Sequence, residues 1–285
     1  MADLVYVNGQ ITAPSQARIS ALDRGFLYGD ALFETMRAYG GKIFRLDQHL
    51  ARLSSSATFL GFDLSRLPEP LEAAVRRTLT ESRLADACVR LTASRGTQRG
   101  LIPEARDIPT VMIEVRVFSP YPARLYEHGA ELIISRYRRD ETSPLSNHKI
   151  TNYLPAILAK REAAATGADD ALFLNRKGDA AEATVANVFV VKDGRVITPP
   201  LSAGILPGIT RAVVIEICRQ SGIPCAQENV TAEQLVAAEE VFLTNTVMEI
   251  LPVQKIGDFI VRAPGAVTQD TAARYRETAR SGVGS

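Results

Sequence analysis

The chain has 285 residues, of which 46% are hydrophobic and 23% charged, and its formal net charge is +1. This length predicts one large or two medium domains with well-buried cores, and the near-neutral charge gives no electrostatic basis for nucleic acid or a membrane surface as a partner. The sequence shows no signal-peptide pattern and no run near the ~18 apolar residues of a membrane span. Cys88, Cys218 and Cys225 have neither metal-ligand spacing nor a disulfide pattern, so we expect a cytoplasmic protein without a metal site.

The first half of the sequence predicts an α+β domain in which strands pack with two helices. Asn8-Gly9 and Gly40-Gly41 are typical turns of β-hairpins. Apolar residues recur on one helical face from 46 to 60, and Asp47 is the expected N-cap of that helix. In chain order we expect hairpins over 4–11 and 36–44, helices over 46–60 and 68–82, a strand over 88–94, an arginine-rich loop over 95–100 and a strand over 110–118.

The predicted linker is Ser119-Pro120-Tyr121-Pro122, because two prolines enforce an extended segment. We therefore expect a small domain over 1–118, a linker over 119–125 and a larger domain over 126–285. In the larger domain the sequence predicts strands over 130–135, 171–174, 185–191, 195–197 and 240–243, and helices over 154–166, from the 204–211 segment to about 220, and from 266 onward.

Lys149 is the first candidate for chemistry. It stands shortly before the helix predicted over 154–166, with polar residues and Pro155 marking the helix start. An amine at such a junction can point into a cleft, and a lysine that is desolvated or flanked by cations can form a Schiff base with an aldehyde. A solvated surface lysine is the competing interpretation, and it is the commoner fate of a single lysine.

Three downstream features strengthen the interpretation of Lys149. Leu206 to Thr210 form a Pro-Gly turn that enters a helix, where backbone amides and a hydroxyl can bind phosphate. Glu182 enters an apolar strand, so it requires a cationic partner or a proton. Thr244-Asn245-Thr246 end a predicted strand and offer hydroxyls. Together these features indicate a pyridoxal 5'-phosphate site. Lys149 offers an amine to the aldehyde, Glu182 offers a carboxylate to the pyridine nitrogen, and the amides and hydroxyls offer donors to the phosphate.

These residues resemble a known family, the fold-type IV pyridoxal-phosphate enzymes or class IV aminotransferases. The family contains branched-chain aminotransferases, D-amino acid aminotransferases and aminodeoxychorismate lyases. The resemblance implies a two-domain α+β / α/β fold, with a small N-terminal α+β domain and a larger C-terminal pseudo-barrel domain that binds the cofactor. Its motifs occur in order in the segments 23–34, 49–53, 182–189 and 204–211.

The resemblance also implies a role for individual residues. Lys149 would be the Schiff-base lysine and proton shuttle, and Glu182 would hold the pyridine nitrogen protonated. Leu206 would pack on the ring face, and Tyr153 would bind the phenolic oxygen, although branched-chain members place their tyrosine one residue further along. The phosphate would be held by Arg52, Ile209, Thr210 and Thr246.

The choice of reaction within the family rests on weaker features. Phe33 stands where D-amino acid aminotransferases usually carry tyrosine, and Arg90 alone is kept from the carboxylate site of branched-chain enzymes. The loop with Arg95 and Arg99 is similar to the arginine-glycine loop of lyases and D-aminotransferases, whereas Thr244 to Ile250 look more lyase-like. We expect a transaminase acting on a small amino acid and a keto acid, with aminodeoxychorismate lyase as the close alternative. Among the arginines, Arg99 is the expected carboxylate ligand.

Two further expectations concern partners and alternatives. The resemblance implies a homodimer or higher homo-oligomer in which a neighbour completes the active site. A phosphate-ligand binding module would explain the phosphate elements, but it would not need Lys149 and Glu182 together. A purely structural two-domain protein would need neither, and an ultraviolet-visible spectrum separates the three interpretations because the cofactor-bound enzyme is yellow.

Overall fold

The chain divides into two units in the computed structural model, which describes residues 3–102 and 108–281. The first unit takes Met1–Ser119, Lys149–Asn152 and Ala279–Ser285, and the second takes Pro120–His148 and Tyr153–Thr278. The segment with Lys149 thus packs with the N-terminal unit, although the sequence places it in the larger domain. The domain limits at 118 and 126 stay a prediction.

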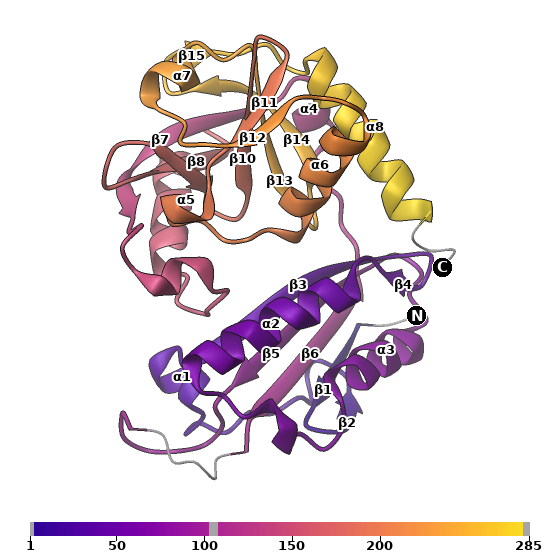
Figure 1. The fold of residues 1–285 in the computed structure, drawn as a ribbon. Coiled ribbons are helices and arrows are strands. Elements are labelled where there is room, and N and C mark those ends of the chain that lie inside the picture. The colour runs from indigo at the N-terminus through magenta and orange to yellow at the C-terminus, as the bar shows by residue number, and fades with distance from the viewer. Residues whose placement is uncertain (1–2, 103–107, 282–285) are drawn as a thin grey trace. The chain divides into compact units, whose positions relative to one another are not determined.

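The first unit is a six-stranded sheet in the order β2-β1-β6-β5-β3-β4. Helices α2 and α3 cover the same face of this sheet, with α2 packed on β3 and α3 on β1 and β6 (Figure 1). The strands are β1 (Leu4–Val7), β2 (Gln10–Thr12), β3 (Ala31–Tyr39), β4 (Lys42–Ile43), β5 (Ala87–Ser94) and β6 (Thr110–Val117). The helices are α1 (Arg24–Tyr28), α2 (Leu46–Leu60), η1 (Leu64–Arg66) and α3 (Leu71–Ser82).

Alternation along β3 decides which side chains meet the helices. Leu32 and Met36 are fully buried and belong to one core with Leu53 of α2 and Val75 of α3. Burial of side chains of this size contributes about 1.5–3 kcal/mol each. Because successive side chains of a strand point to opposite faces, Phe33 lies on the face of the sheet that these helices do not cover.

The prediction that Asp47 is the N-cap of α2 is wrong. The N-cap residue is Arg45, in the left-handed conformation with φ 53° and ψ 39°, and it makes no side-chain cap hydrogen bond. Asp47 lies instead in the first turn, where a carboxylate still interacts favourably with the positive end of the helix dipole.

The second unit is built on a sheet that closes on itself. Strand β9 pairs with β8 and also with β10, so the path β10-β13-β14-β7-β8-β9 returns to β10 and forms a barrel-like ring. Strands β11 and β12 extend from β10, and β15 pairs with β14. The strands are β7 (Ala130–Arg139), β8 (Asp170–Asn175), β9 (Ala180–Ala183), β10 (Asn187–Lys192), β11 (Arg195–Thr198), β12 (Cys225–Gln227), β13 (Glu240–Asn245), β14 (Glu249–Ile256) and β15 (Phe259–Ile260).

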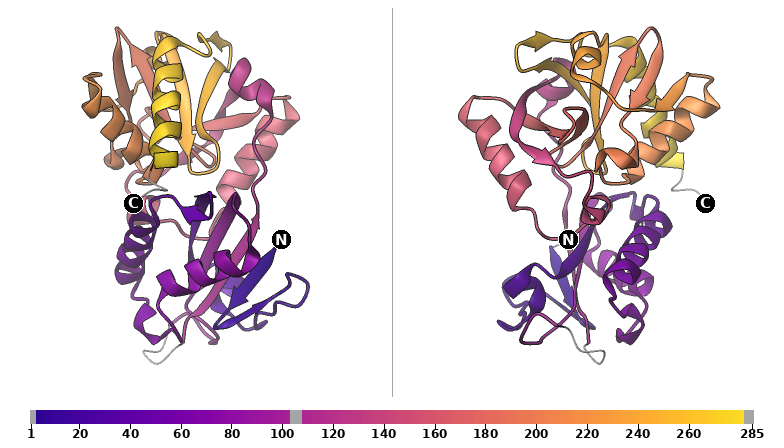
Figure 2. Two further views of the ribbon diagram at one scale, coloured as in Figure 1. Left: turned by 90° about the vertical axis from the view of Figure 1, so that its right-hand side faces the viewer. Right: turned by 60° about the vertical axis from the view of Figure 1, so that its left-hand side comes forward.

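Apolar side chains from the strands of the ring meet in one core that includes Leu132, Leu172, Val188, Leu243 and Val253. Around the ring, α5 packs on β7 and β8, α6 on β12 and β13, and α4 on β14 (Figure 2). The helices are α4 (Ala123–Glu127), η2 (Pro144–Asn147), α5 (Leu154–Ala165), η3 (Leu201–Ala203), α6 (Ile209–Gln220), α7 (Ala232–Val236) and α8 (Ala266–Ser281).

The strand expected over 185–191 is shorter than predicted. Residues 184–186 form a bend that separates β9 from β10, and the amide of Ala183 donates to the carbonyl of Ala186 at 2.8 Å. This reversal lets β9 pair with β10, which closes the ring and brings Glu182 directly opposite Asn187.

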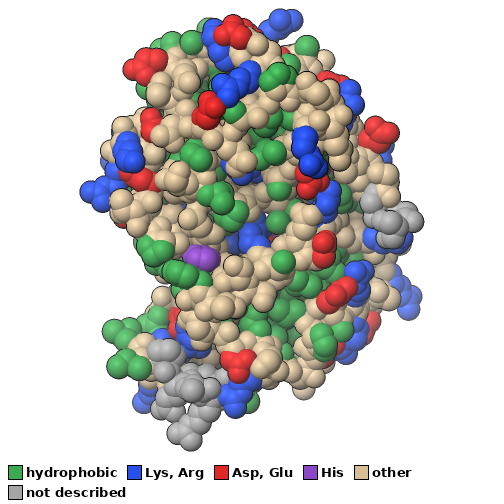
Figure 3. Space-filling view, viewed as in Figure 1, with side chains coloured by type: hydrophobic (Ala, Val, Ile, Leu, Met, Phe, Trp, Pro, Cys, Tyr) green, Lys and Arg blue, Asp and Glu red, His purple; other side chains and the backbone are tan. Residues whose placement is uncertain are grey.

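The surface agrees with the near-neutral composition. Lys and Arg side chains are interspersed with Asp and Glu on the face that Figure 3 shows. Within the described residues, none of the helices combines the length and apolar character that crossing a bilayer requires.

Phe242 should be a strong contributor to the stability of the second unit. It stacks on Phe189 with ring centroids 4.9 Å apart, and both side chains are fully buried. We predict that Phe242→Ala lowers the free energy of unfolding by about 3–5 kcal/mol, because it removes the buried ring and leaves a cavity. A urea titration followed by circular dichroism measures the change.

Phe259 offers a matched control, since it lies on β15 and is 41% exposed. Phe259→Ala should change the free energy of unfolding by about 0.5 kcal/mol or less. Equal effects of the two substitutions would contradict the stacked pair as a stabilising element.

Candidate active site

In the first unit, the segment with Lys149 adds a short antiparallel piece to β3. Ile150 bridges to Leu32, the amide of Phe33 donates to the carbonyl of Lys149 at 2.9 Å, and the amide of Thr151 donates to the carbonyl of Ala31 at 3.0 Å. Lys149 therefore stands opposite Phe33, and directly opposed residues of antiparallel strands project to the same face. The Nζ atom of Lys149 lies 4.4 Å from the centroid of the Phe33 ring.

Arg90 contacts the same ring from β5, which pairs with the edge of β3 opposite to the Lys149 segment. It stands opposite Thr35 in the β3–β5 register, and its guanidinium carbon lies 3.9 Å from the Phe33 centroid. Sequence periodicity leaves open whether Arg90 faces a site or solvent. The register places it half-buried on the face of Phe33 and Lys149.

Thr92 belongs to the same face, because it stands opposite Phe33. Its hydroxyl is buried and has no hydrogen-bond partner among the described residues. A buried hydroxyl without a partner is costly, so its position favours a polar ligand on this face.

The helix side of β3 carries a charged cluster of Glu34, His49 and Arg52. Glu34 is fully buried, and its two carboxylate oxygens accept hydrogen bonds from Arg52 Nε at 2.8 Å and Arg52 Nη2 at 2.6 Å. His49 Nδ1 lies 2.7 Å from Glu34 Oε2. Arg52, which the family resemblance assigns to the phosphate, is thus held by a bidentate carboxylate, the strongest geometry for such a pair.

Protonation in this cluster follows from burial and charge. Burial alone would raise the pKa of Glu34, but the charge of Arg52 and the hydrogen bond with His49 lower it to about 2. Burial lowers the pKa of His49, and the charges of Arg52 and Lys149 lower it further, against the raising effect of Glu34. At neutral pH the carboxylate is therefore ionised and the imidazole neutral, so the Nδ1–H of His49 donates to Glu34.

In the second unit, Glu182 has the cationic partner that an acidic residue in an apolar strand requires. Arg139 Nη2 lies 2.7 Å from Glu182 Oε1. The other oxygen, Oε2, accepts from the amide of Leu206 at 3.0 Å and from Asn187 Nδ2 at 3.3 Å. The side chain of Glu182 is 10% exposed, so these contacts hold a carboxylate that is mostly removed from water.

Polar side chains form a row across three neighbouring strands of the barrel-like sheet, β9, β10 and β13, and Glu182 is the first of them. Asn187 stands opposite Glu182 in β9 and opposite Thr244 in β13, so the three side chains share one face. The hydroxyl of Thr244 is buried and finds no partner within the described part of the chain. Thr246 is half-buried in the turn after β13.

The start of α6 adjoins this row. Its N-cap is Gly208, which has no side chain to cap the first turn, so the helix start can offer the amides of Ile209 and Thr210 to a ligand. Asn187 Nδ2 donates to the carbonyl of Leu206 at 2.9 Å, and a Cβ on Gly208 would lie 2.0 Å from Asn187 Oδ1. Glycine thus lets the helix start pack tightly against Asn187, and the buried hydroxyl of Thr244 is a second feature that fits a polar ligand there.

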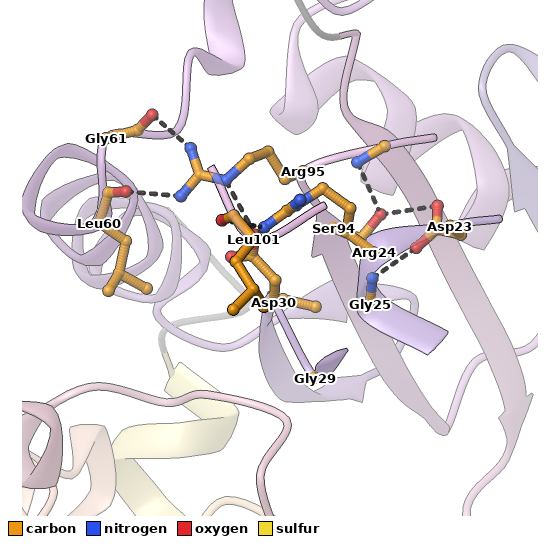
Figure 4. Close-up of polar contacts among 12 residues, drawn as sticks. Asp23, Arg24, Gly25, Gly29, Asp30, Leu60, Gly61, Ser94, Arg95 and Leu101 are labelled. Atoms are coloured by element: carbon orange, nitrogen blue, oxygen red, sulfur yellow. Dashed lines mark hydrogen bonds and ion pairs between the residues drawn. The ribbon is translucent and has the colours of Figure 1, made fainter. Parts of the chain in front are cut away.

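Arg95 occupies a structural position in the first unit (Figure 4). Its Nε donates to Asp30 at 3.0 Å, and its two terminal nitrogens donate to the carbonyls of Leu60 and Gly61 at 2.6 and 2.7 Å. Because structural partners use all three nitrogens, this arginine ties the end of α2 to the sheet, and its expected role toward substrate finds no support in these contacts.

Arg24 anchors the loop that follows β5. Its guanidinium pairs with Asp30 at 2.8 Å and donates to the carbonyls of Gly100 and Leu101 (Figure 4). The same loop carries Arg99, whose side chain is exposed.

The remaining predicted residues lie at element ends. Tyr153 is the half-buried N-cap of α5, and Leu206 is half-buried between η3 and α6. Sequence reasoning missed Arg139 and Asn187 as partners of Glu182, and it named Thr244 without its place opposite Asn187. Arg139 ends a basic run at 136–139, and only the pairing of distant segments distinguishes it from the other arginines of that run.

Comparisons with known proteins place this geometry in a family. The sequence pattern described as Amino-transferase class IV matches residues 31–256. The chain is 36% identical to a putative branched-chain-amino-acid aminotransferase of Methanocaldococcus jannaschii, over 96% of this chain and 95% of the relative. It is 34% identical to the aminodeoxychorismate lyase of Bacillus subtilis, over 89% and 86% of the two chains. Identity to a D-alanine aminotransferase of Staphylococcus epidermidis is 32%, over 88% of each chain.

Solved structures agree with the sequence matches. The branched-chain aminotransferase of the archaeon Thermoproteus uzoniensis superposes with a TM-score of 0.89 at 33% identity, covering 96% of this chain and 93% of that one. Another branched-chain amino acid aminotransferase, solved with pyridoxamine 5'-phosphate, gives a TM-score of 0.91 at 32% identity, over 98% and 95% of the two chains. The expected fold-type IV architecture, with a barrel-like sheet in the larger domain, is thereby confirmed. The chain belongs to the class IV aminotransferase family.

Proposed function

We propose that the protein is a pyridoxal-phosphate-dependent aminotransferase that moves an amino group between a small amino acid and a 2-oxo acid. Members of the class IV family use this cofactor. The observation that carries the proposal is the contact of Lys149 and Arg90 with the ring of Phe33, at 4.4 and 3.9 Å. The Lys149 amine can bind a carbonyl carbon, and the Arg90 guanidinium can bind a carboxylate. Because both groups contact one ring, they lie within the reach of one small amino acid.

The residues present fit the cofactor. When bound, pyridoxal phosphate supplies an electron sink for the substrate's α-carbon. Glu182, an aligned and mostly buried carboxylate, would accept the ring N–H, and Leu206 would pack against the ring. The amides at the start of α6 and the hydroxyl of Thr246 would bind the phosphate, with Thr210 and Arg52 as further donors. Tyr153 would bind the phenolic oxygen.

Lys149 has two tasks in this proposal. Its amine would hold the cofactor's aldehyde carbon covalently, as only a primary amine does reversibly. Once the substrate's amine has displaced Lys149 from that carbon, the freed amine would act as general base and would carry the proton from the substrate's α-carbon to the carbon that the lysine held before. The extended pairing with β3 fixes the backbone of Lys149, so that only the side chain has to move.

Arg90 is the better candidate for the substrate carboxylate. It is half-buried on the face of Lys149, whereas Arg99 is exposed on the loop after β5. A partly desolvated guanidinium binds a carboxylate more strongly than an exposed one. This proposal replaces the expectation from the sequence, which favours Arg99 for its freedom to move.

Aminodeoxychorismate lyase is the alternative reaction. It is favoured by the 34% identity to the Bacillus subtilis lyase, close to the 36% shared with the archaeal relative. Incubation of the purified protein with amino-donor and keto-acceptor panels, and separately with aminodeoxychorismate, decides between the two. Release of 4-aminobenzoate without amino transfer would establish the lyase.

We predict that purified protein carries pyridoxal phosphate on Lys149. Borohydride reduction followed by peptide mapping should place the pyridoxyl group on this residue, because its side chain lies beside Phe33 and Arg90 on one face of β3. Lys149→Ala should lose the yellow colour and the reducible label while it keeps the circular dichroism of the folded protein.

Lys160 is the internal control for this labelling. Its Nζ donates to the carbonyl of Asp169 and pairs with Asp170 at 3.4 Å, so it should stay unlabelled. Label on Lys160 or Lys177 would refute the assignment. A colourless protein that binds inorganic phosphate would favour the phosphate-binding module instead.

Arg90→Ala should raise KM for the amino acid and lower kcat/KM, with the cofactor absorbance unchanged. A lost pair of charged hydrogen bonds corresponds to about 2–5 kcal/mol if the site is desolvated. Steady-state kinetics with the best donor from the panel, together with the visible spectrum, measures both effects.

Arg99→Ala is the matched comparison on the exposed loop. It should retain kcat/KM within about threefold, as expected for an exposed side chain. Normal kinetics for Arg90→Ala with a large loss for Arg99→Ala would reverse the assignment. Normal kinetics for both would show that the carboxylate is held elsewhere.

A homodimer is proposed as the working unit, on the basis of the family resemblance and one surface of the first unit. An apolar patch, formed by α1 and the loop that Arg24 anchors to it, includes Phe26 and Leu101, both 78% exposed, with Leu22, Leu27 and Tyr28 beside them. Apolar side chains exposed together in this way are typical of protein interfaces. A second copy of the chain is the proposed occupant.

Phe26→Glu should therefore weaken the dimer, because it places a charge in an apolar interface. Sedimentation velocity should show the parent protein at twice the chain's 31.0 kDa and the variant shifted toward a single chain. Ile260→Glu, at an 85% exposed position on β15, is the control and should leave the mass unchanged. A fully active monomer of the parent protein would contradict the proposal.

A further inference from the structure

Arg139 connects three segments of the second unit. Its Nη2 pairs with Glu182 Oε1 at 2.7 Å and donates to the carbonyl of Ser146 at 3.2 Å, and its Nε donates to the carbonyl of Gly204 at 3.1 Å. The β7–β8 pairing shifts register between Ile134 and Arg138, directly before this residue. Such irregularities re-aim the side chains that follow them.

The contacts of Glu182 orient both of its carboxylate oxygens. An ionised carboxylate has about four acceptor positions. Arg139 uses one on Oε1, and the amide of Leu206 and the side chain of Asn187 use two on Oε2. Both oxygens are therefore oriented by polar partners, and the proposed function adds the N–H of a protonated pyridine nitrogen as the ligand of this carboxylate.

The charge of Arg139 decides where the proton of such a pair resides. A carboxylate removed from water tends to take up a proton, whereas an adjacent guanidinium favours its ionised form. With Arg139 in place the carboxylate stays charged, so the proton belongs to the pyridine nitrogen. Without it, a neutral carboxylic acid hydrogen-bonded to an unprotonated nitrogen becomes competitive.

We propose that Arg139 is a positioning residue that keeps Glu182 ionised and oriented, and thereby keeps the proton on the cofactor's ring nitrogen. This inference rests on the proposed function and deepens it. Arg139 touches neither substrate nor the reacting atoms in this role, because it acts through Glu182.

A purely structural role is the rival explanation. Arg139 also holds the backbone at Ser146 and Gly204, and Asn147 Nδ2 ties the same region by donating to the carbonyls of Leu201 and Ile205 at 3.1 and 2.7 Å. If these backbone contacts were its whole purpose, its loss would act independently of Glu182. The experiment therefore has to separate the two routes.

The test is a double-mutant cycle of Arg139→Met and Glu182→Gln, read by kcat and by the nitrogen-15 chemical shift of ring-labelled pyridoxal phosphate bound to each protein. Arg139→Met should lower kcat by roughly 10–100-fold, by analogy with the effect of replacing residues that orient metal ligands through a hydrogen bond. The nitrogen signal should move from the protonated toward the unprotonated position. In the Glu182→Gln background the same change should alter kcat by about twofold or less, because coupled residues lose their effects non-additively.

Two further variants protect the test against misfolding and general charge effects. Arg139→Lys keeps the charge and loses the planar fork, so the nitrogen signal should stay near its protonated position while kcat falls less than in Arg139→Met. Arg138→Met removes the neighbouring arginine, which donates to the carbonyl of Ser135, and it should change neither readout.

Each contrary result has a distinct meaning. An unshifted nitrogen signal in Arg139→Met, with its full kcat loss repeated in the Glu182→Gln background, would overturn the inference and establish the structural role. Full turnover and a protonated nitrogen in Glu182→Gln would overturn both this inference and the assignment of Glu182. Failure of the parent protein to take up pyridoxal phosphate would overturn the proposed function itself.

Discussion

The register of β3 against β5 and against the segment around Ile150 is the constraint on which the placement of the first unit's candidate site residues depends. Pairing with β5 and with the segment around Ile150 sets Phe33, Arg90 and Lys149 on one face and Glu34 on the other. A slip of one residue would exchange these faces, burying Phe33 under α2 and exposing a carboxylate. The apolar residues Leu32 and Met36 oppose such a slip, because they would lose their place in the core.

Both units hold an ion pair that is largely removed from water, Glu34 with Arg52 and Glu182 with Arg139. Desolvating such pairs costs free energy that their attraction does not always return, so they are poor devices for stability alone. What they provide is a carboxylate or guanidinium of fixed charge and direction. A site that must distinguish a protonated from an unprotonated ligand nitrogen benefits from that fixed charge.

The fold itself does not select the reaction. Relatives that are 32–36% identical over most of the chain are described as a branched-chain aminotransferase, a lyase and a D-alanine aminotransferase. Because one scaffold serves all three, the selectivity resides in the side chains that meet the substrate rather than in the strand order. On the face of Lys149, the side chains that we propose to meet the substrate are Phe33, Arg90 and Thr92.

The sequence by itself determined the longer helices, most of the strands, the family, and the choice of Lys149 and Glu182 as candidates, because these follow from local patterns and from motifs in sequence order. Only the tertiary structure decided that Arg90 shares the face of Lys149, that Arg95 is a structural tie and that Arg139 is the partner of Glu182. Each of these depends on pairing between segments far apart in the chain. The closure of β9 onto β10 is the plainest case: one bend at 184–186 sets Glu182 opposite Asn187, and a strand pattern read along the sequence cannot reveal which distant strand will pair with it.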